Sequence, residues 1–126
     1  MGRRTFRVLE QTGDAAADYP STQNYVFTHR PLLQPGFTAV NEDPALFVRR
    51  LGKDRNIWVV GGNTILAPLL EQDLVDCMIL QIAPVLLGKG IPLFTQKEGE
   101  KRFELTEIKQ YGPFAELTYR KPNPEA

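Results

Sequence analysis

Apolar residues recur at helical spacing in three segments of the chain, and the segments carry signals for their ends. We predict helices over residues 4–12, 43–52 and 63–72. Asp43 followed by Pro44 is typical of a helix start, because the aspartate accepts bonds from free backbone N–H groups and proline fits the first turn. Asn63 or Thr64 can cap the third helix, in which Pro68 removes one backbone donor.

The other apolar segments predict strands, which we expect at residues 24–28, 37–40, 56–60, 76–84, 103–111 and 114–120. The run at 56–60 is continuous and does not alternate, as in a strand of a parallel sheet that is covered on both faces, and residues 76–84 form another long apolar strand. The last two strands alternate, and Gly112-Pro113 joins them as an antiparallel hairpin. We therefore predict an α/β fold: a three-layer mixed sheet with helices on both faces and a C-terminal antiparallel hairpin.

Length and composition fit one globular domain. The chain has 126 residues, of which 42% are hydrophobic and 24% charged. We assign residues 1–121 to this domain and residues 122–126 to a disordered tail. The formal net charge is zero, unlike that of a typical nucleic-acid-binding domain. No apolar run approaches the roughly 20 residues that cross a membrane. We therefore expect neither nucleic acid nor a membrane as a partner.

Cys77 is the only cysteine of the chain, and it lies in an apolar run. An intramolecular disulfide and a metal site of several Cys and His ligands are therefore excluded, since His29 is also the only histidine. A buried strand position in a reducing compartment fits this cysteine. We expect a cytoplasmic protein without a bound metal.

The segment Val60-Gly61-Gly62-Asn63-Thr64 links a predicted buried strand to a predicted helix start. Glycine lets a ligand approach the backbone closely, and the free N–H groups and dipole of a helix start favour a phosphate. Ligands of α/β sheets also gather beyond the carboxyl ends of the strands. A phosphate-binding loop and a plain tight turn both fit this spacing, which is not the GxGxxG fingerprint.

Two further segments combine hydroxyl groups with positive charge. Thr28-His29-Arg30 ends the first predicted strand, where folds that prefer NAD often carry an acid, so it suits a 2′-phosphate or a solvated loop. Gly2-Arg3-Arg4-Thr5 precedes the first helix and suits a pyrophosphate or a generic basic N-terminus. His29 has no carboxylate or nucleophile near it in sequence, so we assign no general base. The residues alone thus indicate a phosphate-bearing cofactor and no reaction.

Taken together and in order, these segments resemble the dihydrofolate-reductase-like superfamily. Met1–Phe6 is similar to its Met-Gly-Arg-x-Thr-aromatic motif, Tyr25–Thr28 to its strand ending in a hydroxyl residue, and Ile57–Thr64 to its Gly-Gly loop. Leu74–Asp76 and the string Pro-Val-Leu-Leu-Gly-Lys-Gly-Ile-Pro-Leu-Phe at residues 84–94 resemble one branch in particular. That branch is the RibD C-terminal domain family, which includes riboflavin-biosynthesis reductases.

The resemblance implies an NADPH-dependent reductase that passes hydride to a pteridine- or pyrimidine-like small molecule. It also implies a homodimer, since relatives in this branch are commonly dimers. It gives the matched positions roles in holding NADPH: Gly2, Arg3, Arg4 and Thr5 at the pyrophosphate and 2′-phosphate; Thr28, His29 and Arg30 beside the adenosine phosphate; Val60, Gly61, Gly62, Asn63, Thr64 and Ile65 along the nicotinamide and pyrophosphate.

The chain departs from the family pattern in two places. Folate-reducing members carry an arginine just before the position of Asn24, where this chain has Ser21-Thr22-Gln23, so a genuine dihydrofolate reductase ranks last. The family's first strand, active-site loop and first long helix precede the Met-Gly-Arg motif, at which this chain begins. We therefore expect an N-terminally incomplete domain. The alternative function is a non-catalytic NADP-binding or oligomeric module of the same fold.

Overall fold

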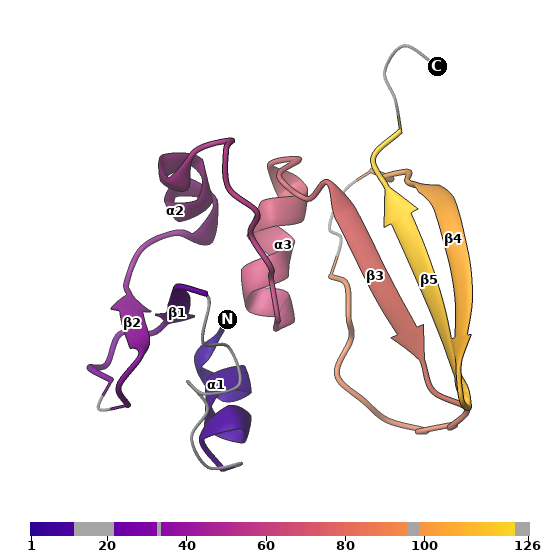
Figure 1. The fold of residues 1–126 in the computed structure, drawn as a ribbon, viewed down its shortest axis with the longest axis horizontal. Helices are drawn as coiled ribbons and strands as arrows, with labels where there is room; N and C mark the ends of the chain where they lie inside the picture. The colour runs from indigo at the N-terminus through magenta and orange to yellow at the C-terminus, as the bar shows by residue number, and fades with distance from the viewer. Residues whose placement is uncertain (12–21, 33, 96–98, 123–126) are drawn as a thin grey trace.

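A computed structural model describes residues 1–11, 22–32, 34–95 and 99–122, so most of the expected tail lies outside the described residues. Figure 1 shows α1, α2, β1 and β2 grouped on one side, a three-stranded sheet on the other, and α3 between them. The expected α/β class is confirmed, with parallel and antiparallel strand pairs. The elements are α1 (Arg3–Glu10), β1 (Asn24–Phe27), β2 (Phe37–Val40), α2 (Pro44–Leu51), α3 (Asn63–Glu71), β3 (Cys77–Ile82), β4 (Glu104–Tyr111) and β5 (Phe114–Arg120).

Strands β1 and β2 pair in parallel, and helices α1 and α2 follow their predicted positions closely. The expected cap of α2 is confirmed, because Asp43 Oδ1 accepts hydrogen bonds from the N–H groups of Ala45 at 2.9 Å and Leu46 at 3.2 Å. Pro44 occupies the first helical position, where its missing N–H leaves no bond unmade. No helix among the described residues could span a membrane.

Two small cores hold the first group of elements together. Phe6 of α1 and Val26 of β1 are fully buried, and the Phe6 ring lies 4.9 Å from that of Phe37 on β2. The second core joins α2 to α3 through Ala45, Ile65 and Leu69. Buried apolar side chains thus hold α1 and α3, the two helices that follow a glycine, in place. The positions of their N-termini are determined by this packing.

The second sheet has the strand order β3-β5-β4, and all its pairs are antiparallel. The expected hairpin is confirmed, since β4 ends at Tyr111 and β5 begins at Phe114. A β-bulge between Leu105 and Glu107 allows Leu105 and Ile108, three residues apart, to share a face, which a regular strand would forbid.

One face of this sheet is apolar and partly open. Cross-strand partners share a face, so the register assigns one side to apolar residues and the other mostly to polar ones. Several members keep much of their surface exposed, as Ile108 does at 66%. We call this side the apolar sheet face; it consists of Met78, Leu80, Ile82, Leu105, Ile108, Leu117 and Tyr119.

The predicted strand at residues 56–60 is wrong, because these residues belong to no strand. Ile57 is 41% exposed and Trp58 is 68% exposed, whereas the apolar run predicted cover on both faces. A parallel strand needs a hydrogen-bonded neighbour, and the strands of the described residues form two sheets that leave this segment out. The single mixed sheet that we expected is therefore divided in two.

Two further details differ from the predictions. Strand β3 pairs antiparallel with β5, and its Cys77 is half-buried rather than buried. The N-cap of α3 is Gly62, so neither Asn63 nor Thr64 caps the helix. A glycine cap supplies no side-chain acceptor, which leaves the first N–H groups of α3 without that partner.

Candidate cofactor site at two helix N-termini

The N-termini of α1 and α3 lie side by side, joined through three glycines. Gly2 caps α1 and Gly62 caps α3, and neither helix has a side-chain cap bond. The Gly2 N–H donates to Gly61 O at 2.8 Å, and a Cβ built on Gly2 would lie 3.7 Å from Gly62 N. We call Gly2, Gly61 and Gly62 the glycine junction. Two sets of free N–H groups and two positive dipole ends meet there, an arrangement that favours an anion.

The three glycines are not equivalent. Gly61 has φ of +135°, which side chains rarely adopt, and a Cβ on it would lie 3.7 Å from Thr5 Oγ1. A Cβ on Gly2 would lie 3.5 Å from Ile65 Cγ1, which is ordinary contact. A Cβ on Gly62 would meet nothing within 4 Å. Gly62 therefore presents open backbone, and a side chain there would occupy only the space in which a ligand could lie.

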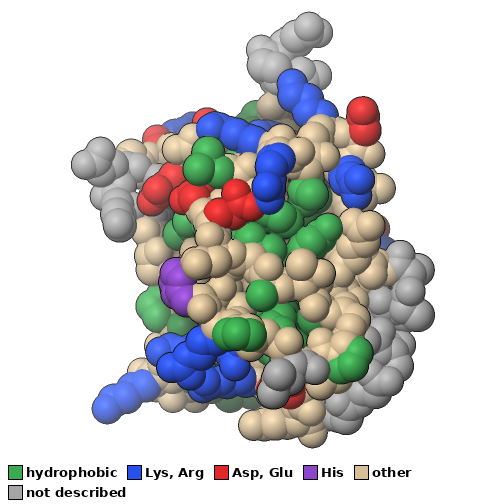
Figure 2. Space-filling view, turned by 90° about the vertical axis from the view of Figure 1, so that its left-hand side faces the viewer, with side chains coloured by type: hydrophobic (Ala, Val, Ile, Leu, Met, Phe, Trp, Pro, Cys, Tyr) green, Lys and Arg blue, Asp and Glu red, His purple; other side chains and the backbone are tan. Residues whose placement is uncertain are grey.

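Arg3, which directly follows Gly2, supplies positive charge beside this junction. Its Nη1 donates to Thr28 Oγ1 at 3.4 Å, and the Arg30 N–H donates to the same oxygen at 3.2 Å. The Arg3 Nε atom is buried, and the described residues offer it no hydrogen-bond partner. An unpaired buried donor on a cation is costly, and a phosphate oxygen would satisfy it. Figure 2 shows Lys and Arg side chains gathered beside His29, the only histidine.

Apart from Asn63, the predicted site residues separate into three sets. Contacts join Gly2, Arg3, Thr5, Thr28, Gly61, Gly62 and Ile65 around the junction. The side chains of Arg4, His29, Arg30 and Thr64 are exposed, so the structure leaves them near this region without fixing them in it. Val60 faces a different space, the cavity described below, which Ile65 also lines.

Asn63 is held by a residue that the sequence did not indicate. Its Nδ2 donates to Thr95 Oγ1 at 2.9 Å, while its Oδ1 is buried and has no partner among the described residues. Thr95 lies 32 residues further along the chain, directly after the string at residues 84–94, and it was not among the predicted site residues. Only the tertiary fold brings these two side chains together.

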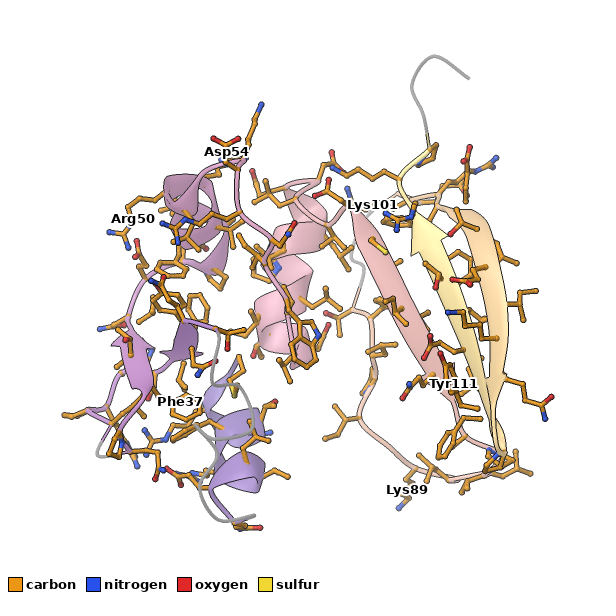
Figure 3. The ribbon with its side chains drawn as sticks, in the orientation of Figure 1. Phe37, Arg50, Asp54, Lys89, Lys101 and Tyr111 are labelled. Atoms are coloured by element: carbon orange, nitrogen blue, oxygen red, sulfur yellow. The ribbon has the colours of Figure 1, made fainter. Side chains whose placement is uncertain are left out.

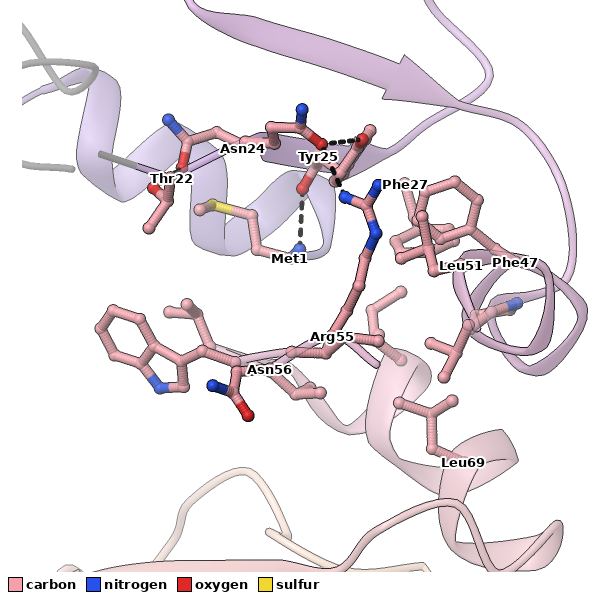
Figure 4. A pocket seen from close by; sticks show the side chains of 18 residues that line it. Met1, Thr22, Asn24, Tyr25, Phe27, Phe47, Leu51, Arg55, Asn56 and Leu69 are labelled. Atoms are coloured by element: carbon pink, nitrogen blue, oxygen red, sulfur yellow. Dashed lines mark hydrogen bonds between the residues drawn. The ribbon is translucent and has the colours of Figure 1, made fainter. Parts of the chain in front are cut away.

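A cavity of about 510 Å³ lies beside the junction, between β1, residues 55–60 and the helices α2 and α3. Its lining is mainly apolar, and the one charged side chain among the lining residues is Arg55, which donates to Gln23 Oε1 at 3.4 Å. These lining residues include no Asp, Glu, His or Cys, and the hydroxyl group of Tyr25, which is among them, donates to Gln23 Oε1 at 3.0 Å (Figure 4). The described residues also contain no group of three or more potential metal ligands.

Comparison with known proteins identifies the family of this chain. A model described as the RibD C-terminal domain matches residues 1–115. The chain is 34% identical to the uncharacterized protein YwjB of Bacillus subtilis over 123 residues, which cover 94% of this chain and 70% of YwjB. It is 31% identical to the riboflavin biosynthesis protein RibD of Escherichia coli over 117 residues, but these make up only 32% of that relative.

Solved structures share the fold. A putative riboflavin biosynthesis protein from Shewanella superposes with a TM-score of 0.76 and 24% identity, covering 98% of this chain and 72% of that one. RibD of Acinetobacter baumannii superposes with a TM-score of 0.53 and 17% identity. That match covers 78% of this chain and 37% of the Acinetobacter protein.

Proposed function

The chain belongs to the RibD C-terminal domain family, and from this premise we propose that it is an NADPH-dependent reductase. The family supports a riboflavin-biosynthesis reductase-like fold. We further propose that its substrate is a small molecule with a pteridine- or pyrimidine-like ring, and that it acts in the cytoplasm. Residues 1–121 would form the cofactor-binding domain.

The observation that carries the proposal is the glycine junction with Arg3 beside it. NADPH brings a pyrophosphate and a 2′-phosphate, and both need concentrated donors and positive charge. Two uncapped helix N-termini suit the pyrophosphate, and the unpaired Arg3 Nε with Thr28 suits the 2′-phosphate. The segments 2–5, 28–30 and 61–65 contain no acidic residue, so nothing in them mimics the ribose-binding acid of NAD-preferring folds.

The bound cofactor would supply the hydride, and the residues of this chain would position it. The open backbone at Gly62 lets a phosphate approach the N–H groups of α3, while Ile65 and the buried core behind it keep that helix in place. The charge of Arg3 would hold the 2′-phosphate at the adenosine end of NADPH. Positioning of this kind lowers a barrier by reducing the entropy lost on the way to the transition state.

We expect NADPH to bind at least about tenfold more tightly than NADH, because a charged contact to the extra phosphate contributes about 1.5–3 kcal/mol. Titration calorimetry with both nucleotides measures this difference directly. Equal dissociation constants would contradict the proposed cofactor. Turnover of NADPH with pteridine and pyrimidinone compounds would then identify the substrate class.

A non-catalytic NADP-binding module is the second candidate, and the lining of the cavity favours it. Many reductions need a proton donor, but the residues around the cavity include no Asp, Glu, His or Cys, and the hydroxyl group of Tyr25 already donates to Gln23. NADPH binding without turnover of any ring compound would support this candidate, whereas measurable turnover by the 126-residue chain would exclude it.

We also propose that the protein is a homodimer, with the apolar sheet face in the interface. Monomers rarely leave so much contiguous apolar surface exposed. We expect Ile108→Lys to shift the mass measured by light scattering from dimer to monomer, since it would bury a charge in the interface. Ile79→Lys is the matched control, because Ile79 is 60% exposed on the opposite face. A wild-type monomer at high concentration would contradict the proposal.

A further inference from the structure

The first residue of α3 is an asparagine that does not cap the helix. Asn63 directly follows the N-cap Gly62, and α3 has no side-chain cap bond. Asparagine side chains readily accept hydrogen bonds from backbone N–H groups close to them in the chain, which is why asparagine is favoured at helix starts. The first N–H groups of α3 have no acceptor within the helix, so they are the natural donors for such a bond. The Asn63 amide group is nevertheless turned elsewhere.

The hydroxyl group of Thr95 holds the Asn63 amide in its observed orientation. Asn63 Nδ2 donates to Thr95 Oγ1 at 2.9 Å, which directs the amide nitrogen toward Thr95. The amide oxygen, Oδ1, is buried and has no partner among the described residues. A buried acceptor without a donor is costly, so this orientation needs another contact to maintain it. The hydrogen bond to Thr95 is the contact that the structure provides.

Thr95 reaches Asn63 from a separate part of the chain, the segment between β3 and β4. Figure 1 shows this segment leaving the end of β3 and returning toward α3. The apolar residues ahead of Thr95 pack little, since Leu86 is 101% exposed and Ile91 is 88% exposed. Thr95 is itself exposed, and its side chain belongs to neither of the two small cores. A substitution that removes only the hydroxyl group therefore tests the bond to Asn63 with little disturbance elsewhere.

We propose that Thr95 is a positioning residue for the glycine junction, because it holds the Asn63 amide away from the N–H groups at the start of α3 and keeps them free for a phosphate group. The inference rests on the proposed function, since the phosphate is that of NADPH. Without the Thr95 hydroxyl, the amide turns, and its oxygen accepts from the N–H group two residues further on, that of Ile65. In the structure, this N–H group donates to Gly62 O at 3.1 Å.

The released amide would act on the ligand and on the fold in opposite directions. Its oxygen carries a partial negative charge, and it would lie in front of a helix N-terminus that attracts phosphate through free N–H groups and a positive dipole end. Phosphate binding would therefore weaken. The ligand-free chain, by contrast, gains a hydrogen bond for an oxygen that is otherwise buried without a partner among the described residues. If the bond to Thr95 merely supported the fold, its removal would lower both stability and affinity.

The test is a double-mutant cycle in the full chain, with titration of NADPH and thermal unfolding of the ligand-free protein. Thr95→Val removes the hydroxyl group and keeps the branched shape, whereas Thr95→Ser keeps the hydroxyl group. Thr95→Val is also made in an Asn63→Ala background, where no amide is present to turn. Amide hydrogen exchange at Ile65, measured without ligand, reports the new bond directly.

We expect Thr95→Val to weaken NADPH binding about tenfold, which corresponds to the contribution of one hydrogen bond. The same variant should slow amide exchange at Ile65 and should not lower the unfolding midpoint of the ligand-free protein. Thr95→Ser should bind NADPH within about threefold of the wild type, because its hydroxyl group can still accept from the amide. In the Asn63→Ala background, Thr95→Val should change the affinity less than about twofold.

An equal loss of affinity from Thr95→Val in both backgrounds would overturn the proposal, since Thr95 would then contact the ligand itself. Unchanged affinity of Thr95→Val, or a lower midpoint of its ligand-free form, would also overturn it. Failure of the wild type to bind NADPH would instead contradict the proposed function. Exchange at Ile65 decides the inference in that case: slower exchange in Thr95→Val supports it, and unchanged exchange overturns it.

Discussion

Gly62→Val is expected to abolish the thermal stabilisation that NADPH gives to the wild-type chain, while leaving the unfolding midpoint of the ligand-free protein nearly unchanged. A Cβ at Gly62 meets nothing within 4 Å, and this glycine has φ of −93°, outside the left-handed region that favours glycine. The side chain would instead fill the space in front of the α3 N-terminus. Saturation at 100 times the dissociation constant stabilises by about 2.7 kcal/mol, and this whole contribution should disappear.

Gly61→Val serves as the contrasting variant. Gly61 has φ of +135°, so a valine there is strained whether or not a ligand binds. We expect it to lower the midpoint of the ligand-free protein, unlike Gly62→Val. Thermal unfolding of both variants with and without NADPH separates loss of binding from loss of stability. If Gly62→Val binds NADPH like the wild type, the junction is only a turn between two elements.

Arg3→Gln is expected to weaken NADPH binding by about 10- to 150-fold and to change NADH binding little. The estimate corresponds to about 1.5–3 kcal/mol for a charge-assisted contact to the 2′-phosphate. Arg3 is the arginine that bonds to Thr28 and has a buried Nε without a partner among the described residues. Titration calorimetry with both nucleotides gives the two ratios.

Arg7→Gln is the matched control for this measurement. Arg7 lies in the last turn of the same helix and is exposed. Arg7→Gln therefore changes the net charge by the same amount as Arg3→Gln but leaves the glycine junction unchanged. It should leave both affinities within about twofold, because exposed charges contribute little. If Arg3→Gln weakened the binding of NADPH and NADH equally, Arg3 would contact the pyrophosphate or stabilise the fold. A role of Arg3 in the choice between the two cofactors would then be contradicted.

One charged contact also depends on the tertiary fold. Lys101 bonds to Asp73 at 2.7 Å and links the segment before β4 to the end of α3 (Figure 3). This contact lowers the pKa of Asp73, first through the hydrogen bond and then through the charge of Lys101. The contribution of this contact to the free energy of unfolding is present above the ordinary pKa of an aspartate. It is lost as the pH falls through the lowered pKa of Asp73. Because Asp73 is exposed, we expect only a small effect on stability.

Local chemistry made several elements predictable from the sequence. Asp43-Pro44 marks a helix start because both residues act within one turn, and Gly112-Pro113 marks a hairpin because the flanking strands alternate. The Gly-Gly loop and the Met-Gly-Arg segment were likewise identified as phosphate-binding candidates from their residues. Such signals need only neighbours in the chain, so no tertiary information is required.

The tertiary structure decided which of these residues meet. The bond from Gly2 to Gly61 and the bond from Asn63 to Thr95 join segments that no local rule connects. The same cause explains the wrong strand at residues 56–60, since a run of apolar residues becomes a strand only when hydrogen-bonded neighbours lie beside it. Apolar pattern is a property of the chain alone, whereas pairing depends on partners that the fold must supply.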